Sequence, residues 1–189
     1  MRIVGVNGSG RVGGNTSVLV KAILQGAADS GGDTHFIELG PLRINGCDSS
    51  RLCKKTHRCA IKDDMERFYE LAPTTDVLVL GWPIYYGHLT GQMMTFYQRT
   101  YCYLGLGFEN FWPRRNVRAV LAITYGAGNP TAYDKVMDWL AEGLKRYYDI
   151  DTVERFRVPG AQRDTFITME HPEAQRSYAF GKALQPSCD

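Results

Sequence analysis

Groups that can bind a phosphate are concentrated near the N-terminus, in the segment GSGRVGGNTS that spans residues 8 to 17. Its side chains offer three hydroxyls, one amide and one positive charge, which come from Ser9, Thr16, Ser17, Asn15 and Arg11. The segment lies between an apolar run and a helical pattern, and backbone N–H groups at the start of a helix attract anions. We interpret it as a phosphate-binding loop. The alternative is an ordinary glycine-rich turn in which Asn15 or Thr16 caps the helix.

Three glycines of this loop, Gly8, Gly10 and Gly13, also match the G-x-G-x-x-G pattern of dinucleotide-binding proteins. That pattern needs an acidic residue about 20 residues further on, which would bind a ribose hydroxyl. Glu38 is the candidate for this role, and it comes late in the sequence. Hydroxyl donors suit a terminal monophosphate better than a bridging pyrophosphate. The loop therefore favours a ligand such as FMN.

Two further segments could hold the flat ring of such a ligand. The first, WPIYYGHLTGQ, spans residues 82 to 92, where a proline stiffens the turn, a glycine lets the backbone come close, and two tyrosines could stack on a ring. The second, TYGAGN, spans residues 124 to 129 and offers hydroxyl and backbone donors. The ring-binding candidates are Pro83, Ile84, Tyr85, Tyr86, Gly87, Thr124, Tyr125 and Gly126. The alternative is that Tyr85 and Tyr86 belong to an aromatic cluster in the core.

Alternating strand and helix patterns must position these loops. Apolar runs predict strands over 2–6, 34–39, 77–80, 117–124 and 150–158. Apolar residues at helical spacing predict helices from 16 to the glycines at 31 and 32, from 63 to 72, and over 91–103, 133–144 and 173–184. Such alternation predicts an α/β protein whose parallel sheet is covered on both faces. The loops that follow the strands then share one edge, where ligands bind.

Length and composition narrow the class of protein. The 189 residues predict one domain over 1–189, in which 41–62 is a long loop after the second strand. A net charge of +2 is too small to indicate a nucleic-acid partner. Residues 77–98 carry no Asp, Glu, Lys or Arg, but their glycines and proline argue against a membrane-spanning helix. The first apolar run is too short for a signal peptide, and the five cysteines are an odd number. We therefore expect a cytoplasmic protein with reduced thiols and no membrane partner.

The three loops together resemble those of the NADPH-dependent FMN reductases and their relatives, the iron–sulfur flavoproteins. Residues 8–17 are similar to the family signature GSPR-x-x-GNTS, residues 83–92 to P-x-Y-x-G-x-x-S-G-Q, and residues 124–126 to T-x-G. The chain departs from the family at Met94 and Gln98, where the family has a lysine and an aspartate. The resemblance covers most of the chain and is weakest over 101–115.

The resemblance implies a flavodoxin-like α/β sandwich with a five-stranded parallel sheet in the order 2-1-3-4-5. It also implies non-covalently bound FMN, NAD(P)H as hydride donor, a small-molecule acceptor such as a quinone or a flavin, and a homodimer or homotetramer. Because the flavin would perform the chemistry, we nominate no catalytic residue. Three alternatives stay open: a flavodoxin-type electron carrier, against which the positive net charge argues, an iron–sulfur flavoprotein, and an NAD-binding Rossmann protein with no enzymatic role.

The loop after the second strand carries Cys47, Cys53 and Cys59. Iron–sulfur flavoproteins have C-x-x-C-x-x-C-x5-C at this place, and this chain keeps that spacing with Ser50 at the second cysteine position. A [4Fe–4S] cluster normally uses four thiolates, so we expect ordinary thiols and no metal. The alternatives are a cluster held by the three cysteines, or zinc held by them together with His57.

Two other groups of residues give a weaker signal. The basic residues Lys54, Lys55, His57 and Arg58 could attract an anion such as the 2′-phosphate of NADPH, or could simply keep the loop solvated. The aromatic residues Phe108, Phe111 and Trp112 could form a subunit interface or belong to the core. We expect structural roles for Cys102 and Cys188, and we assign no role to His35, His88 and His171.

Overall fold

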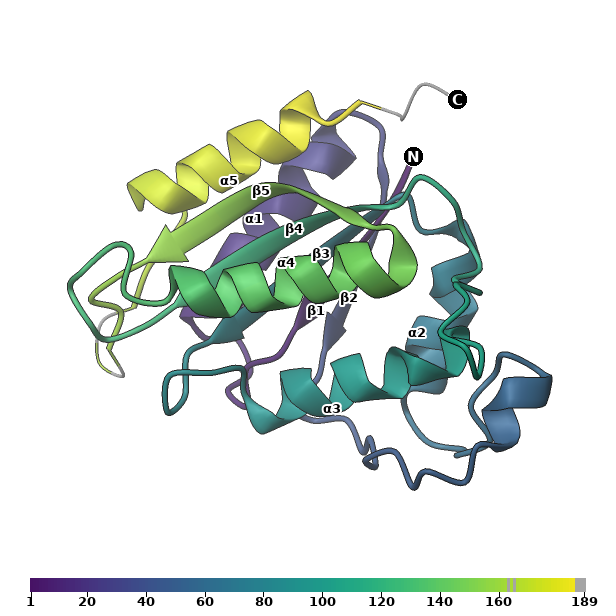
Figure 1. Cartoon of the computed structure of the whole chain (residues 1–189). Helices are drawn as coiled ribbons and strands as arrows, with labels where there is room; N and C mark the ends of the chain where they lie inside the picture. The colour runs from purple at the N-terminus through teal and green to yellow at the C-terminus, as the bar shows by residue number, and fades with distance from the viewer. Residues whose placement is uncertain (163, 165, 186–189) are drawn as a thin grey trace.

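The computed structural model describes residues 1–162, 164 and 166–185, so Cys188 lies outside the described residues. One five-stranded parallel sheet runs through it, in the order β2-β1-β3-β4-β5. The strands are β1 (Arg2–Asn7), β2 (Asp33–Glu38), β3 (Val77–Pro83), β4 (Arg118–Thr124) and β5 (Asp151–Val158). The α-helices are α1 (Asn15–Asp29), α2 (Glu66–Leu71), α3 (Gly91–Arg99), α4 (Asp134–Tyr148) and α5 (Pro172–Ala183). The expected strand order is thereby confirmed (Figure 1).

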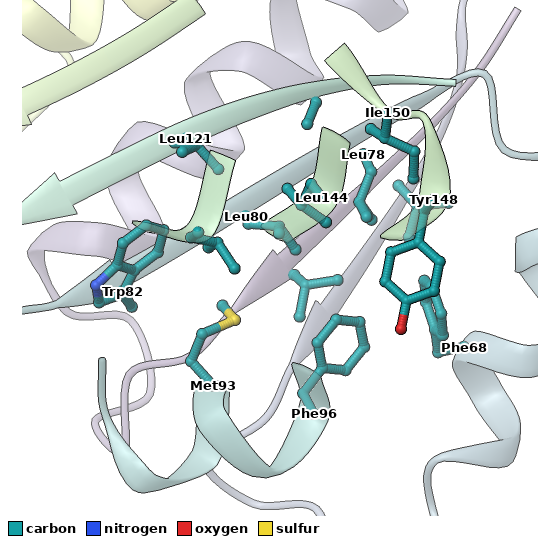
Figure 2. Packing of buried hydrophobic residues seen from close by; sticks show 14 of the residues in the cluster. Phe68, Leu78, Leu80, Trp82, Met93, Phe96, Leu121, Leu144, Tyr148 and Ile150 are labelled. Atoms are coloured by element: carbon teal, nitrogen blue, oxygen red, sulfur yellow. The ribbon is translucent and has the colours of Figure 1, made fainter. Parts of the chain in front are cut away.

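Helices cover both faces of the sheet, which gives three layers (Figure 1). On one face α1 and α5 pack on inward residues such as Ile3, Val79 and Val120. On the other face α2, α3 and α4 enclose a larger aromatic core, and Figure 2 shows Met93 and Phe96 of α3 directed toward the sheet. Burial on both faces explains why the central strands read as continuous apolar runs in the sequence.

The first and last α-helices, α1 and α5, touch through their backbones. A Cβ placed on Gly26 of α1 would collide with the carbonyl oxygen of Tyr178, and one placed on Gly181 of α5 would collide with the carbonyl oxygen of Ile23. Any side chain at either glycine would therefore push the two helices apart. The closeness of this packing depends on glycine at both positions.

Two predicted helices are shorter in the structure than expected. The helix expected to begin at Asp63 and Asp64 begins at Glu66, because both carboxylates accept hydrogen bonds from loop N–H groups instead. The helix expected over 91–103 ends as an α-helix at Arg99 and continues as a 3₁₀ turn, Thr100–Tyr103. Two more 3₁₀ turns are Leu52–Lys55, in the cysteine loop, and Ala72–Thr74, after α2.

No helix in the described part of the chain is long and apolar enough to cross a membrane. The uncharged stretch 77–98 folds as β3, a loop and most of α3, in agreement with its interpretation as strand, loop and helix. The strand is longer than predicted because Gly81, Trp82 and Pro83 continue the pairing with β4.

Candidate functional site

The three predicted loops meet at one edge of the sheet, because β1, β3 and β4 are neighbours and their carboxyl ends lie together. A pocket of ≈ 170 Å³ lies between them. It is lined by Ser9, Arg11, Gly14, Asn15, Thr16, Pro83, Tyr85, Thr124, Ala161 and Gln162. Candidates from the phosphate loop and from the two segments predicted to hold the ring therefore line a single pocket. We call residues 82–92 the first ring loop and residues 124–129 the second ring loop. None of the described residues that line it is acidic.

The phosphate loop is held at its start by β3 and α3. The N–H of Gly8 donates to the carbonyl of Gly81 over 2.7 Å, and the hydroxyl of Thr90 donates to the carbonyl of Gly8 over 2.6 Å. A Cβ on Gly8 would lie 2.7 Å from the Cβ of Met93, which is closer than real Cβ atoms come. Glycine at this position lets the loop pass directly over α3.

The carboxylate of Glu38 holds the far side of the same loop. Its Oε1 accepts from the N–H of Gly13 at 3.1 Å and from the side-chain amide of Asn7 at 3.2 Å. Gly13 has φ = +66°, a left-handed conformation that suits glycine. Glu38 is thus engaged with the loop, whereas a dinucleotide fingerprint needs that carboxylate for a ribose. This geometry argues against the Rossmann alternative.

The start of α1 faces the pocket, and its N-cap residue is Gly14, which has no side chain to accept from the first N–H groups. The alternative in which Asn15 or Thr16 caps the helix is therefore wrong. The Oδ1 of Asn15 accepts instead from the N–H of Ile167 at 3.1 Å, and the hydroxyl of Thr16 lies 2.7 Å from the hydroxyl of Thr124. The N-terminus of a helix carries partial positive charge, so this wall of the pocket suits an anion.

The first ring loop makes a tight turn from Tyr85 to His88. The N–H of Tyr85 donates to the carbonyl of His88 over 3.1 Å, and the N–H of His88 donates back over 3.0 Å. Tyr86 and Gly87 have φ values of 49° and 74°, and a bulky residue such as Tyr86 is strained in that region. Tyr85 lines the pocket, whereas Tyr86 projects fully into solvent at the tip of the turn.

The first two residues of the second ring loop lie in different surroundings. Thr124 lines the pocket, but the next residue, Tyr125, is 3% exposed and belongs to the core on the α4 side of the sheet. Its hydroxyl donates to the carbonyl of Pro130 over 2.7 Å, and burial raises its pKa. Tyr125 was predicted to bind the ring, and this prediction needs correction because the residue lies in the core. The alternative of a core cluster is wrong for Tyr85 and Tyr86, which are both exposed.

Several predicted candidates do not line the pocket, namely Ser17, Ile84, Tyr86, Gly87, Tyr125 and Gly126. Ser17 is fully buried, and its hydroxyl has no hydrogen-bond partner among the described residues. Ile84 packs against the core, while its N–H donates to the carbonyl of Thr124 over 2.9 Å.

A fourth segment, which the sequence analysis did not nominate, completes the pocket. Ala161 and Gln162 follow β5, and the N–H of Ala161 donates to the carbonyl of Tyr125 over 2.9 Å. Pro159 and Gly160 directly after the fifth predicted strand were the available signal, because glycine after a strand marked the other loops as well.

The cysteine loop contributes no residue to the pocket. Cys47 is exposed, and Cys53 and Cys59 are partly buried. Within the described ranges, no three or more His, Cys, Asp or Glu side chains are grouped so that they could hold a metal ion. Burial raises the pKa of the Cys53 thiol, which disfavours the thiolate that metals bind. His57, the fourth ligand of the zinc alternative, stacks on Phe111 with 3.6 Å between the ring centres.

Lys54 is not placed as an anion-binding residue. Its Nζ donates to the carbonyls of Tyr101 and Leu104 over 2.7 and 2.6 Å, and it lies 3.2 Å from the centre of the Tyr101 ring. Both interpretations of Lys54, as a solvated residue or as a binding residue for a 2′-phosphate, therefore need correction, because its ammonium group is engaged by the segment after α3. Lys55 is exposed.

The aromatic segment after α3 is partly core and partly surface. Trp112 is buried beside Tyr103 and Tyr148, whereas Phe108 is 60% exposed. Cys102 is also buried, and burial raises its pKa to about 12, as suits a structural thiol.

Comparison with known proteins identifies relatives of this chain. The family model described as NADPH-dependent FMN reductase matches residues 1–147. An iron-sulfur flavoprotein of Methanocaldococcus jannaschii is 33% identical over 109 residues, which cover 58% of this chain and 56% of that protein. One of Methanosarcina thermophila is 26% identical over 142 residues, or 74% of this chain and 73% of that protein. The chain thus spans little more than half the length of the first of these relatives.

Among solved structures, an NAD(P)H:quinone oxidoreductase from Methanothermobacter marburgensis superposes with a TM-score of 0.71 over 100% of this chain and 98% of that chain, at 12% identity. That likeness confirms the flavodoxin-like fold. The family model extends from β1 to the end of α4 and therefore includes the phosphate loop and both ring loops. The chain belongs to the NADPH-dependent FMN reductase family.

Proposed function

We propose that this protein is an FMN-dependent oxidoreductase that takes hydride from NAD(P)H and reduces quinones, flavins or similar small acceptors. The observation that carries this proposal is the pocket at the carboxyl edge of the sheet. There the start of α1, the side chain of Arg11 and the hydroxyls of Thr16 and Thr124 face one space. Family membership supports the cofactor and the class of donor.

The residues present fit the phosphate end of FMN. Gly14 leaves the first turn of α1 without a side chain over it, and Arg11 adds a full positive charge to the same wall. The nearby carboxylate of Glu38 is engaged by Gly13 and Asn7 and does not line the pocket. Helix dipole, guanidinium and hydroxyl donors all favour an anion at this place.

The pocket is too small for the whole of FMN, so the ring would lie at its open side. A volume of ≈ 170 Å³ is smaller than the roughly 300–1,000 Å³ typical of whole cofactor sites, so it suits the phosphate and its neighbouring atoms. Pro83 and Tyr85 form the wall that continues outward. When bound, FMN supplies the hydride and electron chemistry, and these side chains orient the cofactor and restrict water.

The same proposal extends to the acceptor, the oligomeric state and the cellular location. The acceptor is a small molecule that can reach the open side next to Tyr85, which is 52% exposed. A homodimer or homotetramer is supported by the apolar groove between α3 and α4, where Phe108 and Trp139 are exposed. A cytoplasmic location is supported by the described cysteines, all of which are unpaired.

The visible spectrum of the purified protein tests this function. We expect the absorption of an oxidised flavin, release of FMN on denaturation, and bleaching of the flavin by NADPH without oxygen. A flavin that stays oxidised with both NADPH and NADH would favour an electron carrier. A colourless protein that also failed to bind added FMN would reject the proposal.

A second candidate is an iron–sulfur flavoprotein, because the two relatives described above carry that name. The cysteine loop also resembles the C-x-x-C-x-x-C-x5-C pattern of that class, with Ser50 at the second cysteine position. Iron and sulfide analysis of protein purified without oxygen decides between the two. We expect neither element, since the described thiols form no metal-binding group. Stoichiometric iron and sulfide, lost in Cys53→Ala and retained in Cys102→Ala, would establish the cluster.

A further inference from the structure

Thr124 belongs to a ring loop by sequence, yet its hydroxyl faces the phosphate loop. The Oγ1 of Thr124 lies 2.7 Å from the Oγ1 of Thr16, a hydrogen-bond distance for two hydroxyls. Both residues line the pocket, and they are only 4% and 2% exposed. The last residue of β4 and the first turn of α1 are therefore joined by a buried side-chain hydrogen bond.

The number of protons in this pair leaves one donor for a ligand. Each hydroxyl has one proton and two lone pairs, and one of the two protons lies between the oxygens. A threonine deep in a helix can donate to the carbonyl one turn earlier, but Thr16 is the second residue of α1 and has no helical carbonyl there. The second proton can therefore be directed into the pocket that both residues line.

Packing holds the two hydroxyls together. The methyl group of Thr16 rests on β3, where it would lie 3.1 Å from a Cβ at Gly81. Rotation of Thr16 about χ1 would bring a different group against that strand, so the hydroxyl is held toward Thr124. Thr124 is fixed in turn by the sheet, since its carbonyl accepts from the N–H of Ile84 over 2.9 Å.

We infer that Thr124 is a positioning residue for the phosphate of FMN: it donates to Thr16, and Thr16 donates to a phosphate oxygen. This inference rests on the proposed function. A phosphate only accepts, so the proton order is fixed from Thr124 through Thr16 to the ligand. A hydroxyl that accepts a hydrogen bond is polarised into a better donor, and donation to an anion is the strong case. Thr124 thereby favours FMN over riboflavin without touching the phosphate.

Flavin binding to the apoprotein tests this relay, with fluorescence quenching as the readout and FMN and riboflavin as the two ligands. We expect Thr124→Val to raise the Kd for FMN about fivefold and Thr16→Val to raise it about thirtyfold. Riboflavin binding should change by less than about twofold in both. Because Thr124 acts through Thr16, the double variant should match Thr16→Val alone. Thr124→Ser keeps the hydroxyl and should restore FMN affinity.

Thr152→Val is the matched control, because Thr152 is a strand residue on β5 whose buried hydroxyl has no partner among the described residues. It should leave both Kd values unchanged. The ³¹P resonance of bound FMN should move in Thr124→Val and stay in place in Thr152→Val. Thermal unfolding of each variant separates a change at the site from a loss of fold.

The possible results distinguish a failure of the Thr124–Thr16 relay from a failure of the proposed function. Equal losses of FMN and riboflavin affinity in Thr124→Val would overturn the relay and leave Thr124 a structural or ring-binding residue. Losses that add in the double variant would mean that the two hydroxyls bind the phosphate separately, which also overturns it. A wild-type protein that bound neither flavin would reject the proposed function itself.

Discussion

Two neighbouring loops at the carboxyl edge of the sheet are held in opposite ways. The phosphate loop, residues 8–17, is short, and its backbone is fixed by Gly81, Thr90 and Glu38. The cysteine loop, residues 41–62, is long and is fixed by the cationic side chains of Arg99 and Lys54. The N–H groups of Gly8 and Gly13 and the carbonyl of Gly8 make these supporting hydrogen bonds, and the close packing on Met93 needs glycine at position 8. A loop with no residue in the pocket can be held by long side chains.

Arg99 is the centre of the cysteine loop. Its side chain is fully buried, pairs with Asp63 over 2.7 Å and donates to the carbonyls of Asn45 and Ile61 over 2.8 and 3.3 Å. Both ends of the loop thus converge on one guanidinium, whose planar donors suit several acceptors at once. Burial alone would raise the pKa of Asp63, but hydrogen bonds from Arg99 and from two backbone N–H groups hold it below its usual value.

Removing the guanidinium of Arg99 should have the largest effect on stability. We expect Arg99→Leu to lower the free energy of unfolding by about 3–5 kcal/mol, because it leaves the buried Asp63 carboxylate without its partner. Urea unfolding measures the change. Arg114→Leu is the control, since Arg114 pairs with Asp76 at the surface and should cost less than about 1 kcal/mol. Equal losses of unfolding free energy in the two variants would contradict the conclusion that Arg99 holds the cysteine loop.

The pH dependence of stability gives a second view of the same pair. A carboxyl whose pKa is lowered in the folded state stabilises it above its unfolded pKa of about 3.9 and loses that contribution as the pH falls below that value. The stability difference between wild type and Asp63→Asn should therefore be largest above about pH 5 and shrink on acidification. A difference that stayed constant down to pH 3 would contradict this.

Glycine contacts should matter in the phosphate loop and not in the cysteine loop. Gly8→Ala places a methyl against Met93, so we expect a loss of about 1–3 kcal/mol in unfolding free energy and about a tenfold weaker binding of FMN as the loop shifts. Gly46→Ala is the matched control, because a Cβ there meets no atom within 4 Å. Equilibrium unfolding and FMN titration measure both effects. Comparable losses at the two glycines would remove the contrast between the loops.

Lys54 should act on stability and leave nicotinamide binding alone. Lys54→Met removes two hydrogen bonds to carbonyls after α3, so we expect a loss of about 1 kcal/mol in the free energy of unfolding. The KM values for NADPH and NADH should stay the same. A selective rise in the KM for NADPH would instead restore the 2′-phosphate role, and Lys55→Met shows whether exposed charge alone has such an effect.

The smallest effect should come from the thiols. Cys53→Ala changes a partly buried residue that lies outside the pocket, so we expect the rate of flavin reduction by NADPH to change by less than about twofold. Stopped-flow absorbance without oxygen measures this rate. A large fall would mean that the cysteine loop reaches the flavin in the working protein, and the two loops would then share one function.

The predictable part of the site is the part encoded by local sequence. Ser9, Arg11 and Thr16 lie in one short segment between a strand and a helix, and the parallel sheet brings that segment beside Pro83 and Thr124. Strand order follows from the family resemblance. Helix ends were less predictable, since Asp63 and Asp64 look like the start of a helix until their distant partners are known.

Long-range contacts of single side chains account for what the sequence did not reveal. Nothing near Thr124 indicates that its hydroxyl meets Thr16, and nothing near Arg99 indicates that it binds both ends of the cysteine loop. Tyr85, Tyr86 and Tyr125 illustrate the same limit. Their types suit a flavin site equally, and only the fold separates the pocket wall, the exposed tip and the core.

The backbone contact between α1 and α5 has a consequence for how the protein matures in the cell. The phosphate loop and α1 are made before α5, so α1 stays uncovered on one side until Gly181 leaves the ribosome. At common rates of synthesis that interval is on the order of 10 s. Through this time the nascent chain displays a phosphate loop whose helix is not yet held in place. We therefore expect FMN to bind only after α5 has been made and packed on α1.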